Sequence, residues 1–110
     1  MVKDYKILIS HILECIDKIE EYVKSITKEE FLRSTQIQDA VMRRVEIIGE
    51  AVKHIPEDVK VKYADIPWKR IAGMRDILIH EYFGVDLELT WKVAKVEILD
   101  LKKKIAKIGA

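Results

Sequence analysis

Apolar residues recur at steps of three and four along four long stretches of this chain. These stretches cover about residues 4–25, 35–55, 68–83 and 87–108. Such spacing places the apolar side chains on one face of an α-helix, and no stretch shows the sustained alternation that is typical of a strand. The sequence therefore predicts an all-α fold: a bundle of four long helices plus one or two short ones, in a single domain covering residues 1–110.

Capping residues support these boundaries. Thr27 and Glu30 have the spacing of a capping box, which is expected to start a short helix between the first two long ones. The side chains able to cap the second and the last long helices are those of Ser34 or Thr35 and of Asp86. In the last helix, the residues expected to face the core are Leu89, Val93, Val96 and Leu101.

Two glycines have different expected roles. Gly49 lies inside the second long helix, where glycine costs ~1 kcal/mol relative to alanine. Close approach of a neighbouring helix would explain its presence there. Gly84 follows the third helix and can adopt the left-handed conformation that ends a helix.

The overall charge is nearly balanced, with 20 basic and 19 acidic residues. Any contact with nucleic acid must therefore come from a local basic cluster or from a surface formed by more than one copy. Three clusters are candidates, and the sequence does not choose among them: Lys102, Lys103, Lys104 and Lys107; Arg43 and Arg44; and Lys69 and Arg70.

A few residues bear on the cellular location of the protein and on whether it binds a metal. Cys15 is the only cysteine, no apolar run is long enough to span a bilayer, and no signal peptide is evident. The expected location is therefore the cytoplasm. His11 and Cys15 are four residues apart, but two ligands are too few for a metal site, so no metal and no cofactor are expected.

Arg75 falls in the middle of the apolar stripe of the third helix. Because arginine stays charged, a buried guanidinium must pair with a carboxylate or face a polar cleft or a subunit interface. The alternative is an arginine whose stem covers the helix while its charge reaches water.

His80 follows Arg75 by five residues, which is ~140° around a regular helix. The two side chains would then converge only if the helix is irregular or if a second copy contributes to the site. Asp76 is four residues before His80 and could orient its imidazole on the same helical face. Histidine can act as acid or base and arginine can stabilise a phosphorane, so two copies of each, supplied by a dimer, would suffice to cleave RNA without a metal. A surface or core histidine without catalytic role is the alternative.

The segment from Arg75 to Tyr82 resembles the Arg-x4-His-x-Tyr motif of HepT toxins, a branch of the HEPN superfamily. The residues at 47–51, 67–75 and 82–86 also resemble HepT sequences, in matching order along nearly the whole chain. Asp76 departs from the pattern, because many relatives have asparagine there.

The resemblance implies a HEPN-like homodimer in which two motifs meet in a cleft and cut RNA without a metal. Arg75 and His80 would be catalytic, Asp76 supporting, and cleavage would pass through a 2′,3′-cyclic phosphate. It also implies a toxin–antitoxin system, in which an MntA-type nucleotidyltransferase silences the toxin by AMPylation of Tyr82.

Two other functional classes remain open at this stage. One is a non-catalytic helical subunit that presents nucleotide or substrate to a minimal nucleotidyltransferase, with Arg75 gripping phosphate. The other is a purely structural interaction domain, for which Tyr82 would be a core aromatic residue with its hydroxyl at the rim.

Overall fold

The computed structural model describes residues 5–80 and 84–108, and every structural statement below concerns those ranges. The elements in chain order are α1 (Tyr5–Val23), α2 (Lys28–Arg33), α3 (Thr35–Lys53), α4 (Glu57–Lys62), α5 (Trp68–Ala72), α6 (Met74–Leu78), β1 (Ile79–His80), β2 (Gly84–Val85), α7 (Leu87–Lys92), the π-helical turn η1 (Val93–Glu97) and α8 (Ile98–Ala106). Among the described helices, none is long and apolar enough to cross a membrane.

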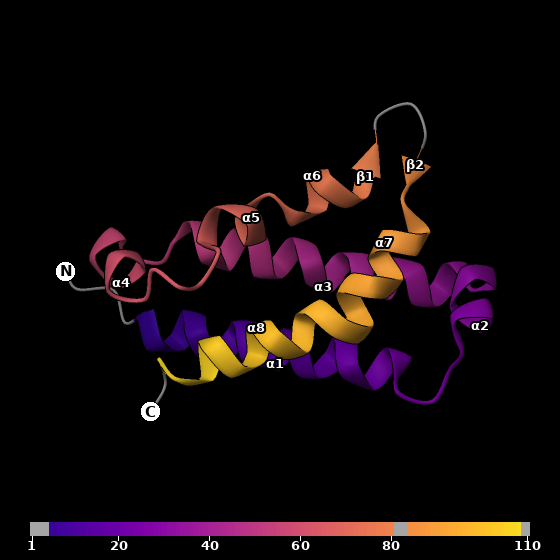
Figure 1. Cartoon of the computed structure of the whole chain (residues 1–110), viewed down its shortest axis with the longest axis horizontal. Helices are drawn as coiled ribbons and strands as arrows, with labels where there is room; N and C mark the ends of the chain where they lie inside the picture. The colour runs from indigo at the N-terminus through magenta and orange to yellow at the C-terminus, as the bar shows by residue number, and fades with distance from the viewer. Residues whose placement is uncertain (1–4, 81–83, 109–110) are drawn as a thin grey trace.

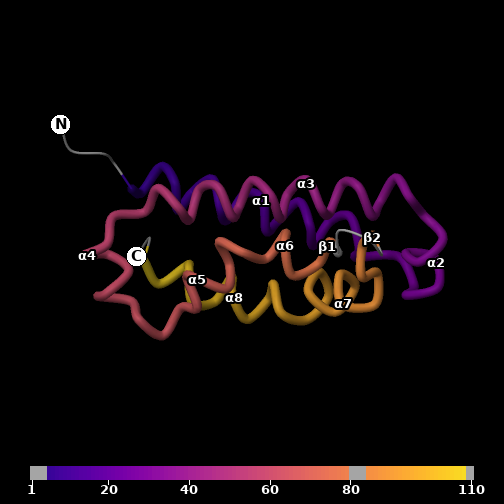
Figure 2. The backbone as a smooth tube through the Cα atoms, turned by 90° about the horizontal axis from the view of Figure 1, so that it is seen from above, coloured from indigo at the N-terminus to yellow at the C-terminus, as the bar shows by residue number. Residues whose placement is uncertain are grey.

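The helices form two layers. The long helices α1 and α3 lie side by side in one layer, and the second layer holds α5 and α6 beside the α7–η1–α8 segment (Figures 1 and 2). Apart from the two-residue pairing of β1 with β2, the described elements are helical, so the predicted all-α class is confirmed.

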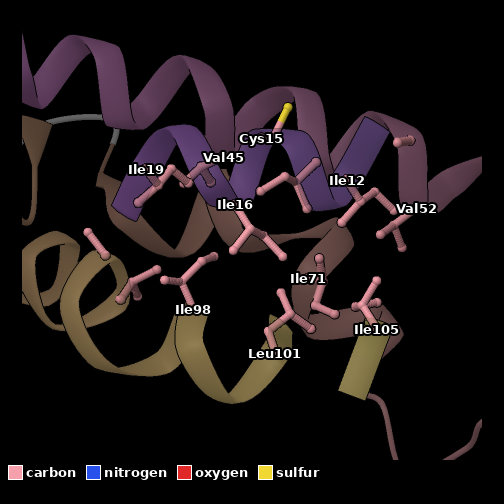
Figure 3. Close-up of a cluster of buried hydrophobic side chains, with 14 of the residues drawn as sticks. Ile12, Cys15, Ile16, Ile19, Val45, Val52, Ile71, Ile98, Leu101 and Ile105 are labelled. Carbon is pink, nitrogen blue, oxygen red and sulfur yellow. The ribbon is translucent and has the colours of Figure 1, made fainter. Parts of the chain in front are cut away.

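The core lies between these two layers. Figure 3 shows apolar side chains from α1, α3, α5 and α8 meeting there, with Ile16, Ile71, Ile98 and Leu101 among them. Ile16 is fully buried, and the buried hydrophobic residues form one cluster. One continuous core is what the helical spacing of apolar residues predicted.

The predicted caps are present. The hydroxyl of Thr27 accepts a hydrogen bond from the Glu30 amide at 3.1 Å, and the Glu30 carboxylate accepts from the Thr27 amide at 2.9 Å. Ser34 accepts from the amide of Ile37, which decides between Ser34 and Thr35 as the cap of α3. Asp86 accepts from the Leu89 amide at the start of α7.

The expected continuous helix over residues 68–83 is wrong. Gly73 separates α5 from α6, and α6 ends at Leu78, after which Ile79 and His80 pair antiparallel with Val85 and Gly84. Glycine is a poor helix former, which explains the break at Gly73. Leu78 is buried, and its carbonyl oxygen accepts a hydrogen bond from the Asp86 amide at 2.7 Å, so the chain is held in a new direction after α6. Gly84 has φ of +73°, as expected, but it serves a hairpin rather than a helix end.

The expected inward face of the last helix is correct only in part. Val93 and Leu101 are buried, whereas Val96 is 59% exposed. The reason is the π-helical turn η1, whose wider winding rotates the residues within it relative to an α-helix of the same sequence. The segment after η1 then returns Ile98 and Leu101 to the core.

Gly49 has the role that its position predicted. A Cβ atom at this residue would lie 3.1 Å from the carbonyl oxygen of Ala72, a contact that real Cβ atoms rarely make. The absence of a side chain therefore allows the backbone of α5 to pack directly on α3. This close approach fixes where α6 begins, and hence where Arg75 lies.

Candidate active site

Arg75 lies in the first turn of α6, directly above α3. Its Nε donates a hydrogen bond to Oε2 of Glu46 at 2.8 Å, which is one of the arrangements that the sequence left open for this arginine. The Arg75 side chain is 49% exposed and that of Glu46 is 35% exposed. At this exposure an ion pair contributes at most about 1 kcal/mol to stability. Its main effect is to hold the guanidinium in one orientation.

Asp76 has a different setting from the one expected. The expected placement of Asp76 and His80 one turn apart on a helix does not exist, because α6 ends before His80. The carboxylate of Asp76 lies 3.5 Å from Nη1 of Arg75, and its side chain is 84% exposed. The Arg75 guanidinium therefore lies between two carboxylates, Glu46 from α3 and its neighbour Asp76.

The backbone of His80 lies in β1, opposite Gly84 of β2. This hairpin projects from the helical layers beside α7 (Figure 1). The calculated 140° separation of Arg75 and His80 does not apply, because only Arg75 is on the helix. Tyr82, the expected AMPylation site, lies outside the described residues.

A groove runs along α3 between α1 and α6, and we call it the Arg75 groove. Its volume is about 450 Å³, within the usual range of ligand sites. The ionisable residues that line it are His11, Arg43, Glu46, Glu50, Lys53, His54, Arg75 and Asp76. Three cations face three carboxylates here, so the groove of one copy has no strong net charge with which to attract a polyanion.

Glu46 contacts Arg75 in the candidate site, and sequence reasoning offered no reason to select it. It is 29 positions from Arg75, and nothing in a single sequence connects the two. Its only local signal is a carboxylate at the edge of the apolar stripe between the buried residues Val45 and Ile48. That signal equally fits a solvated helix surface.

The described residues contain no group of three or more His, Cys, Asp and Glu that could hold a metal ion. Cys15 is buried, and its sulfur lies 3.8 Å from Nη1 of Arg44, whereas His11 is exposed and lines the Arg75 groove. The candidate pair of His11 and Cys15 is therefore divided between the interior and the surface.

Comparison with known proteins places this geometry in context. The family described as "Ribonuclease HepT-like" matches residues 12–108. A protein of Methanocaldococcus jannaschii named "Gamma-glutamylcyclotransferase and putative RNase" is 57% identical over 98% of this chain. The chain spans 49% of the length of that relative.

Two further relatives match over most of their own length. A protein of Thermococcus cleftensis named "Probable ribonuclease HepT" is 46% identical over 98% of both chains. Another protein of Methanocaldococcus jannaschii, named "Putative RNase", is 49% identical over 96% of this chain and 88% of its own. No solved structure matches this chain.

Proposed function

The chain belongs to the HepT-like ribonuclease family, and on that premise we propose that it is a metal-independent endoribonuclease, acting as the toxin of a toxin–antitoxin system. Arg75 and His80 are the catalytic residues in this proposal. The observation that carries it is the placement of Arg75: a half-exposed guanidinium, oriented by Glu46, at the wall of an open groove. The planar fork of an arginine in such a place suits a phosphate.

The chemistry needs an acid and a base in addition to a cation. One imidazole removes the 2′-OH proton, the 2′-oxygen attacks phosphorus, and the bond from phosphorus to the 5′-oxygen breaks as a second imidazole protonates that oxygen. The products are a 2′,3′-cyclic phosphate and a 5′-hydroxyl end. Arg75 stabilises the charge of the phosphorane. One chain has a single His80, so a site in which both imidazoles are those of His80 requires two copies.

A homodimer with one shared cleft satisfies this need. A two-fold axis brings the same segment from each copy to one place. The hairpin that carries His80 projects from the helical layers, so it is well placed to reach a second copy (Figure 1). Arg75, in α6, is held against α3 by its ion pair with Glu46, whereas His80 is in the projecting strand β1. The proposal therefore has both His80 side chains and both Arg75 side chains in one cleft.

Cleavage without metal tests the proposal. We expect the purified protein to cut single-stranded RNA in the presence of excess EDTA, because the residues of the site supply acid, base and cation themselves. Mass spectrometry of the fragments should find 2′,3′-cyclic phosphate ends. Intact RNA after incubation with dimeric, unmodified protein would contradict the proposal and would favour a non-catalytic subunit of a nucleotidyltransferase.

The proposal includes regulation by a cognate MntA-type nucleotidyltransferase that adds AMP to Tyr82. Tyr82 follows His80 by two residues, so each added AMP would bring bulk and negative charge next to the catalytic segment. The modified toxin should then bind and cut RNA poorly, because the added phosphate competes with the RNA phosphate for the same cations.

Mass measurement after co-expression tests this regulation. We expect the chain to gain the mass of one or more AMP units when it is produced with the nucleotidyltransferase encoded beside it. The gain should vanish in Tyr82→Phe and persist in the matched control Tyr63→Phe. An unchanged mass of the wild-type chain, or a gain that persists in Tyr82→Phe, would rule out Tyr82 as the modified residue.

A further inference from the structure

The three basic clusters of the sequence have different surroundings in the structure. In the C-terminal cluster, Nζ of Lys102 lies 2.9 Å from both Asp17 and Glu20. Hydrogen bonds to Glu20 and Asp17 raise the pKa of Lys102, so it stays charged, but its charge is balanced by two carboxylates. In the second cluster, Arg44 turns toward α1, where it contacts the hydroxyl of Tyr22 and the sulfur of Cys15.

The third cluster lies over a hollow between α4 and α5. Four basic residues line it against one acidic residue: Lys53, Lys60, Lys69 and Arg70 against Glu57. A second hollow, between α1 and η1, has the opposite balance, with three carboxylates and two lysines. In a chain with nearly equal numbers of acidic and basic residues, the hollow at α4 and α5 is a local excess of positive charge. We call it the α4–α5 face.

Two of these four cations have no ion pair among the described residues. Lys53 is paired with Glu50 at 3.2 Å, and Arg70 is paired with Glu97 at 2.9 Å. Within residues 5–80 and 84–108, neither Lys60 nor Lys69 has a carboxylate partner. Both can therefore bind an external anion without first breaking an internal pair.

The α4–α5 face is held rigidly beside the Arg75 groove. The buried Trp68 donates from Nε1 to the carbonyl oxygens of Lys60 at 3.2 Å and Tyr63 at 3.1 Å, which ties the end of α4 to the start of α5. Gly49 in turn allows α5 to pack on α3. Lys53 and Ala72 line both the groove and the face, so the two surfaces are continuous.

We propose that the α4–α5 face binds the phosphates of single-stranded RNA that flank the bond cleaved in the Arg75 groove, through Lys60 and Lys69. This inference rests on the proposed ribonuclease function for its substrate. The acidic and basic residues of the Arg75 groove balance, so the groove alone attracts a polyanion weakly. The neighbouring α4–α5 face supplies the positive charge that the groove lacks. RNA binding here depends on the number of phosphates and little on sequence, because lysines contact the backbone.

Direct binding tests the proposal independently of cleavage. The probe is a single-stranded 2′-O-methyl RNA, which lacks the 2′-OH nucleophile and cannot be cut. We expect the double variant Lys60→Gln/Lys69→Gln to bind it about tenfold more weakly, with a salt dependence (log Kd against log salt) that is shallower by about 1.4. The matched control is Lys24→Gln/Lys92→Gln, which removes the same amount of charge away from the α4–α5 face. Lys24 follows α1, and Lys92 is the last residue of α7. This control should bind the RNA as wild type does.

Unchanged affinity and salt dependence in Lys60→Gln/Lys69→Gln would overturn the inference, whether or not the protein cuts RNA. Weakening to the same degree in both double variants would also overturn it, because the effect would then be one of overall charge. If binding depends on Lys60 and Lys69 but unmodified RNA stays intact, the α4–α5 face stands as an RNA-binding surface and the ribonuclease proposal fails.

Discussion

Replacing Arg75 by alanine is expected to lower kcat for RNA cleavage by about 10³-fold, because a cation aimed at developing phosphorane charge contributes mainly to the transition state. The fold should survive, since the Arg75–Glu46 pair is half exposed and worth at most about 1 kcal/mol. Rates measured on a short RNA, beside the midpoint of thermal unfolding, check both parts. A kcat within tenfold of wild type would remove Arg75 from the catalytic residues.

The same prediction extends to the residue that orients Arg75. Glu46→Gln keeps the size of the side chain but removes the charge that aligns the guanidinium, so kcat should fall by about tenfold with little change in KM. Glu50→Gln is the matched control, because Glu50 lines the same groove but pairs with Lys53. An equal loss in both variants would mean that the charge of the groove matters and the orientation of Arg75 does not.

The sequence predicted those parts of the fold that local chemistry decides. The capping box at Thr27 and Glu30, the caps at Ser34 and Asp86, and the close approach at Gly49 all depend on neighbours within a turn or on the lack of a side chain. Such features leave a trace in a few consecutive residues. The apolar periodicity likewise predicted a single core between helices.

The errors arose where tertiary packing overrides periodicity. Ile79 continues the apolar pattern of α6, yet Ile79 and His80 form β1, because pairing with β2 and the Leu78–Asp86 hydrogen bond outweigh helix propensity over so short a segment. The exposure of Val96 follows from the π-helical turn, which has no sequence signal of its own.

For the candidate site, the sequence predicted candidate residues but not how they are arranged. Arg75 and His80 were singled out because their segment resembles the Arg-x4-His-x-Tyr motif of HepT toxins, but their mutual placement could not be predicted, because it depends on where α6 ends. The contact of Arg75 with Glu46 joins two helices through residues far apart in the chain. The choice of Lys60 and Lys69 required knowing that α4 and α5 bring them together over one hollow.

In the proposed dimer, one cleft shared by two copies needs His80 from both. A heterodimer of one wild-type chain and one His80→Ala chain, isolated through two different affinity tags, tests this requirement. We expect it to cleave RNA at least about 10²-fold more slowly than wild type, because either the acid or the base is missing from the shared cleft. A heterodimer with one wild-type chain and one Tyr63→Phe chain should cleave as wild type does. Activity at roughly half of wild type in the His80→Ala heterodimer would mean two independent sites and would rule out the shared cleft.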